Sequence, residues 1–457
     1  MIKKMLPLFA VLLGVAQNAG AQEQNPECVT NLSIFVEHVK VKNYDAAYEP
    51  WKMVKNTCPD INAAVYVYGE RILKHKIKGT TGEEKTKHIN DLMSLYDASL
   101  KYFPKRNKLG EVAVDKAILM FDEKLGTDEQ IYNLLDDTFR KDKANFKNPK
   151  GLYLYFSTLV NMHNAGKKEL QNVFDTYDDV TERVDEEKKK LLTVIDKLLP
   201  KEEAKTLTNK ETKSLRVARS TAEIFDRISG SIDAKLGVLA DCEKLIPLYT
   251  STFPSKKNDA VWLKRAANRM DSKECSDDPL FIQIVEALHQ LDPSAKSAYY
   301  LGFLNDKKGN SSEAIKYYDE SLNLETDTYE KAKTSLKIAH KYKKRGQKST
   351  SRNYARKALE YQPSMGRAYL LLASLYAGSA NQCGTTTFEK KSVYWLAANT
   401  ARKAGQVDSS LKAEAAKAVK GYASRAPSKT EIFQQGMAGK TVKLKCWIST
   451  SIKVPKL

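Results

Sequence analysis

Residues 439–441, Gly-Lys-Thr, are the first candidate for chemistry because they match the end of a phosphate-binding loop. Such a loop also needs a glycine separated from the Gly-Lys pair by four residues, and this chain has Gln434 there. The loop must open a helix, whereas Val442, Leu444 and Cys446 alternate with polar residues in the pattern of a strand. We therefore predict a turn into a small β appendage and no nucleotide site.

The other residue types that catalyse reactions or bind metals show no useful spacing. The histidines match neither HExxH nor another metal-ligand pattern, and no GxSxG nucleophile motif occurs. The six histidines are His38, His75, His88, His163, His289 and His340. A run of carboxylates at 175–187 precedes three lysines, as on a solvated helix face. The sequence thus predicts a protein that is not an enzyme and has no catalytic residue, cofactor or metal.

The first residues of the chain have the order of a secretory signal. Two lysines precede an apolar run from Met5 to Val15, and Ala19-Gly20-Ala21 supplies the small residues of a cleavage site. We expect residues 1–21 to be removed. No later stretch is apolar enough to span a bilayer, so we expect a periplasmic or outer-membrane-associated protein with no transmembrane segment after cleavage.

Positive charge is concentrated in the last third of the chain. The formal net charge is +19, and residues 328–457 hold 26 Lys and Arg against 6 Asp and Glu. The densest cluster, which we call the basic patch, is Lys341, Lys343, Lys344, Arg345, Lys348, Arg352, Arg356 and Lys357. Two interpretations stay open: the patch keeps the protein soluble, or it attracts an anionic surface such as lipopolysaccharide or lipid headgroups. Export argues against nucleic acid as the target.

The elements that must position these residues read as a helical repeat. Residues 295–328 place Gly302, Ala314, Tyr318 and Leu324 at the small and large positions of a 34-residue tetratricopeptide repeat. A second unit follows, and a third is interrupted by the insertion GSANQCGTTTFEKK. The fold class predicted is all-α, a tetratricopeptide-repeat solenoid of helical hairpins with a short C-terminal β appendage.

The domain organisation follows from the quality of the repeats. After the signal peptide we expect degenerate hairpins at 22–199, a charged insertion or loose helix at 200–218, further hairpins at 219–292, well-matched repeats at 293–424 and a basic β tail at 425–457.

Cysteine positions fit helical hairpins, because the start of the first helix lies beside the end of the second. An even number of cysteines in an exported chain indicates disulfides. We expect the pairs Cys28–Cys58 and Cys242–Cys275 within hairpins, and Cys383–Cys446 between the insertion and the β tail.

Candidates for partner contact lie on the first helices of the good repeats. Tyrosine combines apolar area with a hydrogen-bonding tip, which suits a ligand groove. Asn305 and Tyr342 occupy the same position in successive repeats, and Tyr299 lies on the same helix as Asn305. We expect these three residues to line a partner groove.

At this level the chain resembles a family of exported tetratricopeptide proteins of Bacteroidota. The segments NYDAAYEPWKMVKNTCP, DLMSLYDASLKYFP, LDPSAKSAYYLG and the terminal CWI carry the resemblance over nearly all of the mature chain. It implies a scaffold that binds a peptide or protein in its concave groove and that has no defined enzymatic activity. The tail KTVKLKCWISTSIKVPKL is more basic than the resemblance leads us to expect.

We therefore expect a non-catalytic exported scaffold that docks a protein or peptide partner in the cell envelope, as an accessory subunit of an outer-membrane assembly or secretion machine. The alternative is an envelope-binding protein whose basic C-terminal third holds lipopolysaccharide, anionic lipid or cell wall.

Overall fold

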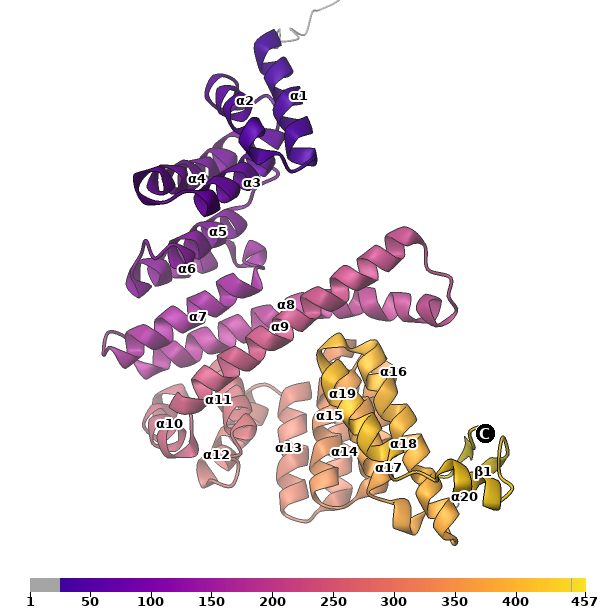
Figure 1. Cartoon of the computed structure of the whole chain (residues 1–457). Coiled ribbons are helices and arrows are strands. Elements are labelled where there is room, and N and C mark those ends of the chain that lie inside the picture. The colour runs from indigo at the N-terminus through magenta and orange to yellow at the C-terminus, as the bar shows by residue number, and fades with distance from the viewer. Residues whose placement is uncertain (1–24, 445) are drawn as a thin grey trace, which may run out of the picture. The chain divides into compact units, whose positions relative to one another are not determined.

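The computed structural model describes residues 25–444 and 446–457, so the predicted signal peptide at 1–21 lies outside the described residues. Across the described ranges the chain folds into helices α1 to α20 and one two-stranded antiparallel sheet (Figure 1). None of these helices is both long and apolar enough to cross a membrane. The predicted all-α tetratricopeptide solenoid with a short β appendage is confirmed.

The chain forms two compact units. The first holds the residues up to 125 together with 134–146, and the second holds 126–133 together with 147–457. In the first unit the helices are α1 (Pro26–Lys40), α2 (Tyr44–Thr57), α3 (Ala64–Gly79), α4 (Gly82–Tyr102) and α5 (Leu109–Asp122), and α6 (Asp128–Asp142) contributes residues to both units. Trp51 is buried at the centre of α1 to α3, where its indole N–H donates to the carbonyl of Val65 at 2.7 Å.

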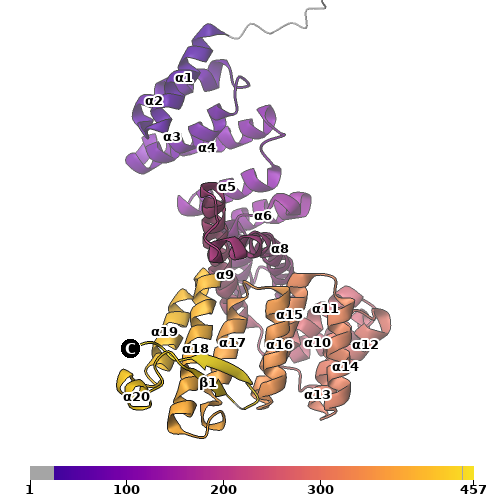
Figure 2. The same cartoon turned by 90° about the vertical axis from the view of Figure 1, so that its right-hand side faces the viewer.

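The second unit continues with α7 to α12 and then the well-matched repeats. Its first helices are α7 (Pro149–Asn164), α8 (Leu170–Glu203), α9 (Asn209–Leu239), α10 (Cys242–Lys256), α11 (Ala260–Ser272) and α12 (Pro279–Leu291). The repeats are α13 (Ala295–Lys307), α14 (Ser311–Leu324), α15 (Thr328–Lys344), α16 (Lys348–Tyr361), α17 (Gly366–Ala377), α18 (Thr387–Val407) and α19 (Lys412–Ala423). Figure 2 shows these repeat helices stacked in chain order.

Small residues let the two helices of a repeat approach closely, as the sequence predicts. A Cβ atom on Gly302 of α13 would lie 2.6 Å from Cδ1 of Tyr318 on α14, a distance that only glycine avoids. Gly309 and Gly346 end the first helices of successive repeats with φ of +82° and +74°, a left-handed conformation that glycine adopts without strain. The hairpins α13–α14, α15–α16 and α17–α18 follow from this chemistry.

Helices α8 and α9 form a hairpin that is longer than the repeats, and the two helices lie side by side (Figure 1). Residues 200–218, expected as a charged insertion or loose helix, hold the end of α8, a turn and the first part of α9. Thr208 caps α9 in a reciprocal arrangement with Glu211, which satisfies free backbone N–H groups at the start of the helix. The charged segment is therefore the tip of a helical hairpin.

The six cysteines form three disulfides, Cys28–Cys58, Cys242–Cys275 and Cys383–Cys446. These are the pairs expected from the sequence. The first joins the start of α1 to the end of α2, and the second joins the start of α10 to the loop after α11. The third ties the insertion in the third repeat to the C-terminal tail.

The tail consists of α20 (Lys429–Gln434), β1 (Thr441–Leu444) and β2 (Thr450–Lys453). The strands are antiparallel, with Val442 opposite Ile452. The alternating pattern predicts a strand through Cys446 and Ile448, but both residues lie in the connection between the strands, which corrects that expectation. Arg352 binds the carbonyls of Trp447 and Ile448 at 2.7 and 2.9 Å, so these groups are occupied outside the sheet.

Candidate functional site

A cavity of about 660 Å³ in the second unit lies between α8 and the helices α11, α13 and α15, of which α13 and α15 are the first helices of successive repeats. First helices line the inner face of a tetratricopeptide array, where such proteins bind ligands. Here α8 runs along this face, so the cavity has one wall from the array and one from α8. A neighbouring cavity of about 460 Å³ is bounded by α8, α9, α15 and the loop before α17.

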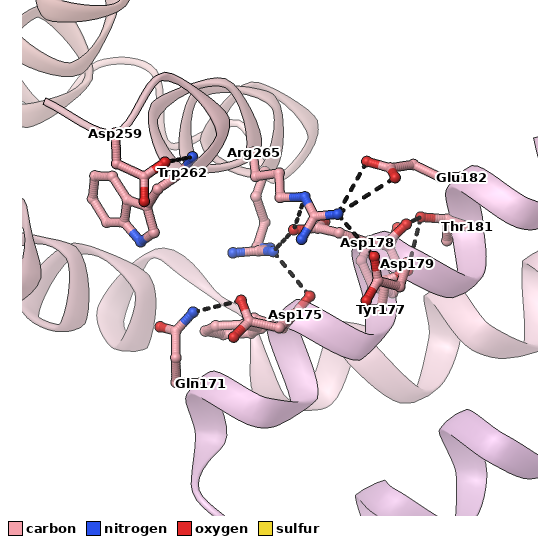
Figure 3. A network of polar contacts seen from close by, with 12 residues as sticks. Gln171, Asp175, Tyr177, Asp178, Asp179, Thr181, Glu182, Asp259, Trp262 and Arg265 are labelled. Carbon is pink, nitrogen blue, oxygen red and sulfur yellow. Dashed lines mark hydrogen bonds and ion pairs between the residues drawn. The ribbon is translucent and has the colours of Figure 1, made fainter. Parts of the chain in front are cut away.

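Charge pairs attach one end of α8 to the array. Arg265 of α11 contacts Asp179 of α8 at 2.9 Å and Glu182 at 3.4 Å (Figure 3). Arg269 is buried and binds the carboxylate of Asp178 together with the backbone carbonyl of Phe174. Burial raises the pKa of Asp178 to about 6, against the lowering effect of the two arginines.

The other end of α8 is attached by hydrogen bonds and an apolar cluster. The carboxylate of Asp196 accepts from the backbone N–H of Ser364 at 2.9 Å. Leu198 and Leu199 belong to a buried cluster that includes Val407 of α18, and Tyr369 of α17 packs against that cluster. The helix is therefore held at both ends, and it covers the inner face between them.

In the middle of the cavity, some lysines pair with a carboxylate and others do not. Lys333 of α15 pairs with Asp185 of α8 at 2.5 Å and with Glu330 at 3.3 Å. Lys341, eight residues further along the same helix, pairs at 3.0 Å with Asp271, whose side chain is 8% exposed. Asp185, Glu330 and Asp271 are thus each paired with Lys333 or Lys341.

Two further ammonium groups line the same cavity without such a partner. Lys296 of α13 and Lys337 of α15 form no ion pair and no hydrogen bond within the ranges that the structure describes. Their nitrogens lie 5.8 Å from the ring centre of Tyr300 and 6.0 Å from that of Tyr299. The two rings contact each other with centres 5.2 Å apart. The two ammonium groups therefore lie near the two members of one aromatic pair.

Burial and mutual repulsion make these charges costly. Burial, together with the positive charge of Lys337, lowers the pKa of Lys296 to about 7. Burial also lowers the pKa of Lys337, although Asp271 acts in the opposite direction. An anion placed between them would raise both pKa values and would remove this cost.

The residues predicted to line the groove have a different place. Tyr299 is 2% exposed and Tyr342 is 0% exposed, so neither ring faces a ligand, and we correct that expectation. Tyr342 stacks on Tyr354 with ring centres 5.8 Å apart, which fills the space between helices. Asn305 is partly exposed and donates to the carbonyl of Leu301 in its own helix at 3.0 Å. A partner contact at Asn305 stays a prediction.

The sequence holds a signal for some of the lysines that line the cavity. Lys296 and Lys333 each lie thirteen residues before the glycine that ends a first helix, Gly309 and Gly346, so they occupy the same repeat position. Tyrosines are more frequent in these repeats, and the sequence therefore favours them as groove residues. Which of two neighbouring positions faces inward depends on packing that the repeat pattern alone does not define.

The basic patch is largely engaged inside the protein. Four members form ion pairs, namely Lys341 with Asp271, Lys344 with Glu274, Arg345 with Asp306 and Lys357 with Asp319. Lys343, Lys348 and Arg352 donate to Ser374, to the carbonyl of Gly378 and to the carbonyls of Trp447 and Ile448. Arg356 is exposed. Most of the patch is thus used to hold the repeats and the tail together.

No protein-family model matches the chain. Photosystem I assembly protein Ycf3 of Cyanophora paradoxa is 28% identical over an alignment of 132 residues, and the match covers 26% of this chain and 76% of that protein. A tetratricopeptide repeat protein from Parabacteroides merdae is 10% identical and covers 66% of this chain and 94% of its own, with a TM-score of 0.25. Yeast Tom70 is 11% identical and covers 89% and 93%, also with a TM-score of 0.25. At these values the comparisons assign no ligand or activity to this chain.

Proposed function

We propose that the protein is a non-catalytic scaffold that docks a segment of a partner protein in the cavity beneath α8, and that the partner supplies a carboxylate to Lys296 and Lys337. The observation that carries the proposal is the pair of ammonium groups that line this cavity without an ion pair or hydrogen bond to the described part of the chain. Burying a charge is costly unless it is paired.

The surroundings favour one carboxylate over a polyanion. The facing wall of the cavity includes Glu182, Asp185 and Glu186 of α8, which would repel a ligand with several negative charges. A single carboxylate on a segment of mixed charge meets the lysines on one side without crowding the acids on the other. Side-chain and chain-terminal carboxylates share this chemistry.

The size of the site fits a short extended segment. A volume of about 660 Å³ lies in the usual range of ligand pockets. A helix as wide as α8 needs more room than the cavity offers while α8 stays in place. We therefore propose that the partner binds as an extended stretch of a few residues, next to α8.

Peptide selection tests this proposal. The purified protein is screened against random peptides that carry either a free or an amidated C-terminus, and it is compared with the double variant Lys296→Gln, Lys337→Gln. We expect the selected peptides to carry carboxylates and to lose at least about tenfold in affinity for the variant, because a charge-assisted contact is lost. Equal loss for free and amidated peptides would assign the carboxylate to an Asp or Glu side chain.

A matched control variant has the same net charge as the double variant Lys296→Gln, Lys337→Gln. The variant Lys78→Gln, Lys87→Gln removes two exposed lysines of α3 and α4 and should bind the peptides like the natural protein. Peptides that bind both variants as tightly as the natural protein would overturn the lysine pair as the site. A screen that selects no peptide would overturn docking in this cavity.

Binding should also be coupled to protonation. Because the pKa of Lys296 is about 7 in the folded protein, an anion that raises it makes the protein take up protons near pH 8. Calorimetric titrations in buffers of different ionisation enthalpy measure this uptake. Lys296→Gln should abolish most of it.

We further propose that the protein is exported and acts in the cell envelope, as a member of the exported tetratricopeptide family of Bacteroidota that the sequence resembles. Three disulfides support an oxidising compartment. An accessory role in an outer-membrane assembly or secretion machine would agree with the name of its relative Ycf3, an assembly protein. Mass spectrometry of the protein from fractionated cells tests export: residues 1–21 should be missing and no free thiol present, whereas an uncut, reduced protein would contradict it.

A further inference from the structure

We propose that the C-terminal β-hairpin binds the surface of an anionic phospholipid membrane through Lys440, Lys443, Lys453 and Lys456, with Phe433 as an apolar contact. This surface is separate from the cavity beneath α8, and the proposal does not depend on the partner docking proposed above.

The first observation is an excess of unpaired positive charge. Residues 412–457 hold ten Lys and Arg and two acids, Glu414 and Glu431. Glu431 pairs with Lys391 of α18 at 2.6 Å. None of the four hairpin lysines named above forms an ion pair in the part of the chain that the structure describes. From residue 440 to the end the sequence contains no acid at all.

The second observation is the orientation of the sheet. Its inner face carries Val442, Leu444 and Ile452, which are buried, and both strands contact α18. Lys443 and Lys453 lie on the opposite, exposed face. Thr441 is opposite Lys453 and Lys443 is opposite Ser451, so the two lysines lie diagonally across the two strands.

Lys440 and Lys456 flank the two strands at the open end of the hairpin. The carbonyl of Lys440 accepts from the backbone N–H of Val454 at 2.8 Å, which holds the two chain segments together just before β1 and after β2. Both lysines are exposed. Four ammonium groups are thus presented on one short element.

The hairpin is fixed before any ligand binds. The disulfide Cys383–Cys446 joins it to the third repeat, and the indole N–H of Trp447 donates to Ser379 at 3.2 Å. Arg352 holds the carbonyls of Trp447 and Ile448. A rigid element loses little conformational entropy when it binds, so this charge is available at low cost.

An anionic bilayer is the partner that these features fit. Clustered lysines at a membrane surface each gain from its negative potential and need no matching shape. Phe433 of α20 is 74% exposed, which is unusual for a large apolar side chain, and it precedes β1 by eight residues. Aromatic side chains beside lysines are typical of segments that lie at the membrane interface.

Vesicle binding tests the proposal with the full disulfide-bonded chain. The probes are vesicles of phosphatidylcholine with 30% phosphatidylglycerol (roughly the anionic fraction that draws polybasic segments) and vesicles of phosphatidylcholine alone. We expect co-sedimentation with the anionic vesicles at low salt, with marked weakening at high salt because salt screens exposed charges. The variant in which Lys440, Lys443, Lys453 and Lys456 become Gln should bind about 100-fold more weakly.

The control removes the same charge elsewhere. Lys42, Lys78, Lys87 and Lys105 of the first unit are exposed, and their joint replacement by Gln should leave vesicle binding within about twofold of the natural protein, because lysines outside the contact add little at this ionic strength. Phe433→Ser should weaken binding several-fold without changing its salt dependence. An intact Cys383–Cys446 disulfide and an unchanged circular dichroism spectrum show that the variants are folded.

Three outcomes would overturn the proposal. The natural protein could fail to bind anionic vesicles at low salt, or bind neutral vesicles equally well. The hairpin variant and the control variant could also lose affinity equally, which would assign binding to net charge. Loss of vesicle binding in the hairpin variant with intact peptide selection at the cavity would show that the two surfaces are independent.

Discussion

Two lysine-rich stretches of the C-terminal third, residues 341–357 and 440–456, look alike in sequence and differ in structure. In the first, Arg345 binds the buried Asp306, Lys341 binds Asp271 and Arg352 binds backbone carbonyls. In the second, Lys440, Lys443, Lys453 and Lys456 are exposed and form no ion pair within the described residues. A count of basic residues therefore does not measure the positive charge that a surface offers to a partner.

The difference between the two stretches is tested most directly by a substitution at Arg345. Asp306 is 1% exposed, and Arg345→Ala would leave its carboxylate buried without its cation. We expect a loss of about 3 kcal/mol in the free energy of unfolding of the second unit, as for other broken buried pairs. Lys443→Ala on the hairpin should change stability by less than about 0.5 kcal/mol. Urea unfolding followed by circular dichroism measures both.

The pH dependence gives the Arg345 prediction a second test. Burial raises the pKa of Asp306, and Arg345 acts against this rise. Without Arg345 the folded-state pKa lies further above the unfolded one. The destabilisation should therefore be full at pH 8 and should shrink as the pH falls through the folded-state pKa, because the carboxyl takes up a proton. The double variant Arg345→Ala, Asp306→Asn should recover stability at pH 8. An equal loss at all pH values would contradict a buried-charge origin.

A smaller loss of stability is expected at Arg352, the residue of the first stretch that binds backbone carbonyls of the second. Arg352→Ala removes two hydrogen bonds, to the carbonyls of Trp447 and Ile448, and a contact with the indole ring at 5.3 Å. Bonds to a charged donor contribute about 2 kcal/mol. We expect amide hydrogens of β1 and β2 to exchange about 30-fold faster, with those of α13 unchanged.

Arg352→Lys serves as the control for charge. It keeps the positive charge but cannot present the same planar pair of donors to two carbonyls, so exchange should stay faster than in the natural protein. Normal exchange in Arg352→Lys would mean that charge alone positions the tail. Unchanged exchange in Arg352→Ala would assign the whole attachment to the disulfide Cys383–Cys446.

The features that could be read from sequence are those set by neighbours in the chain. Gly302, Ala314 and Tyr318 predict a hairpin because their spacing defines a local contact, and the cysteine pairs follow from the same hairpin geometry. The covered inner face could not be read in this way. Lys333 and Asp185 are 148 residues apart, and nothing in either segment indicates that α8 lies along the array.

The candidate site was only partly predictable for a related reason. The sequence placed it on the first helices of the repeats, which is where the cavity lies. It could not decide between Tyr299 and Lys296, three residues apart on one helix, because the burial of Tyr299 depends on Asp271 and Tyr318 from other helices. The same limit applies to Tyr342, which stacks on Tyr354 of the next helix.

The smallest predicted effect concerns an exposed ion pair of the first stretch, which neutralises charge but contributes little to stability. Lys344 and Glu274 pair at 2.5 Å, but their side chains are 74% and 76% exposed. Exposed pairs contribute little, because water solvates both ions when the pair is broken. Lys344→Ala should therefore change the free energy of unfolding by less than about 0.5 kcal/mol, the same as Lys443→Ala. If Lys344→Ala instead approached Arg345→Ala, pairing itself and not burial of the acid would stabilise this stretch, and the contrast with the hairpin would depend on the number of pairs alone.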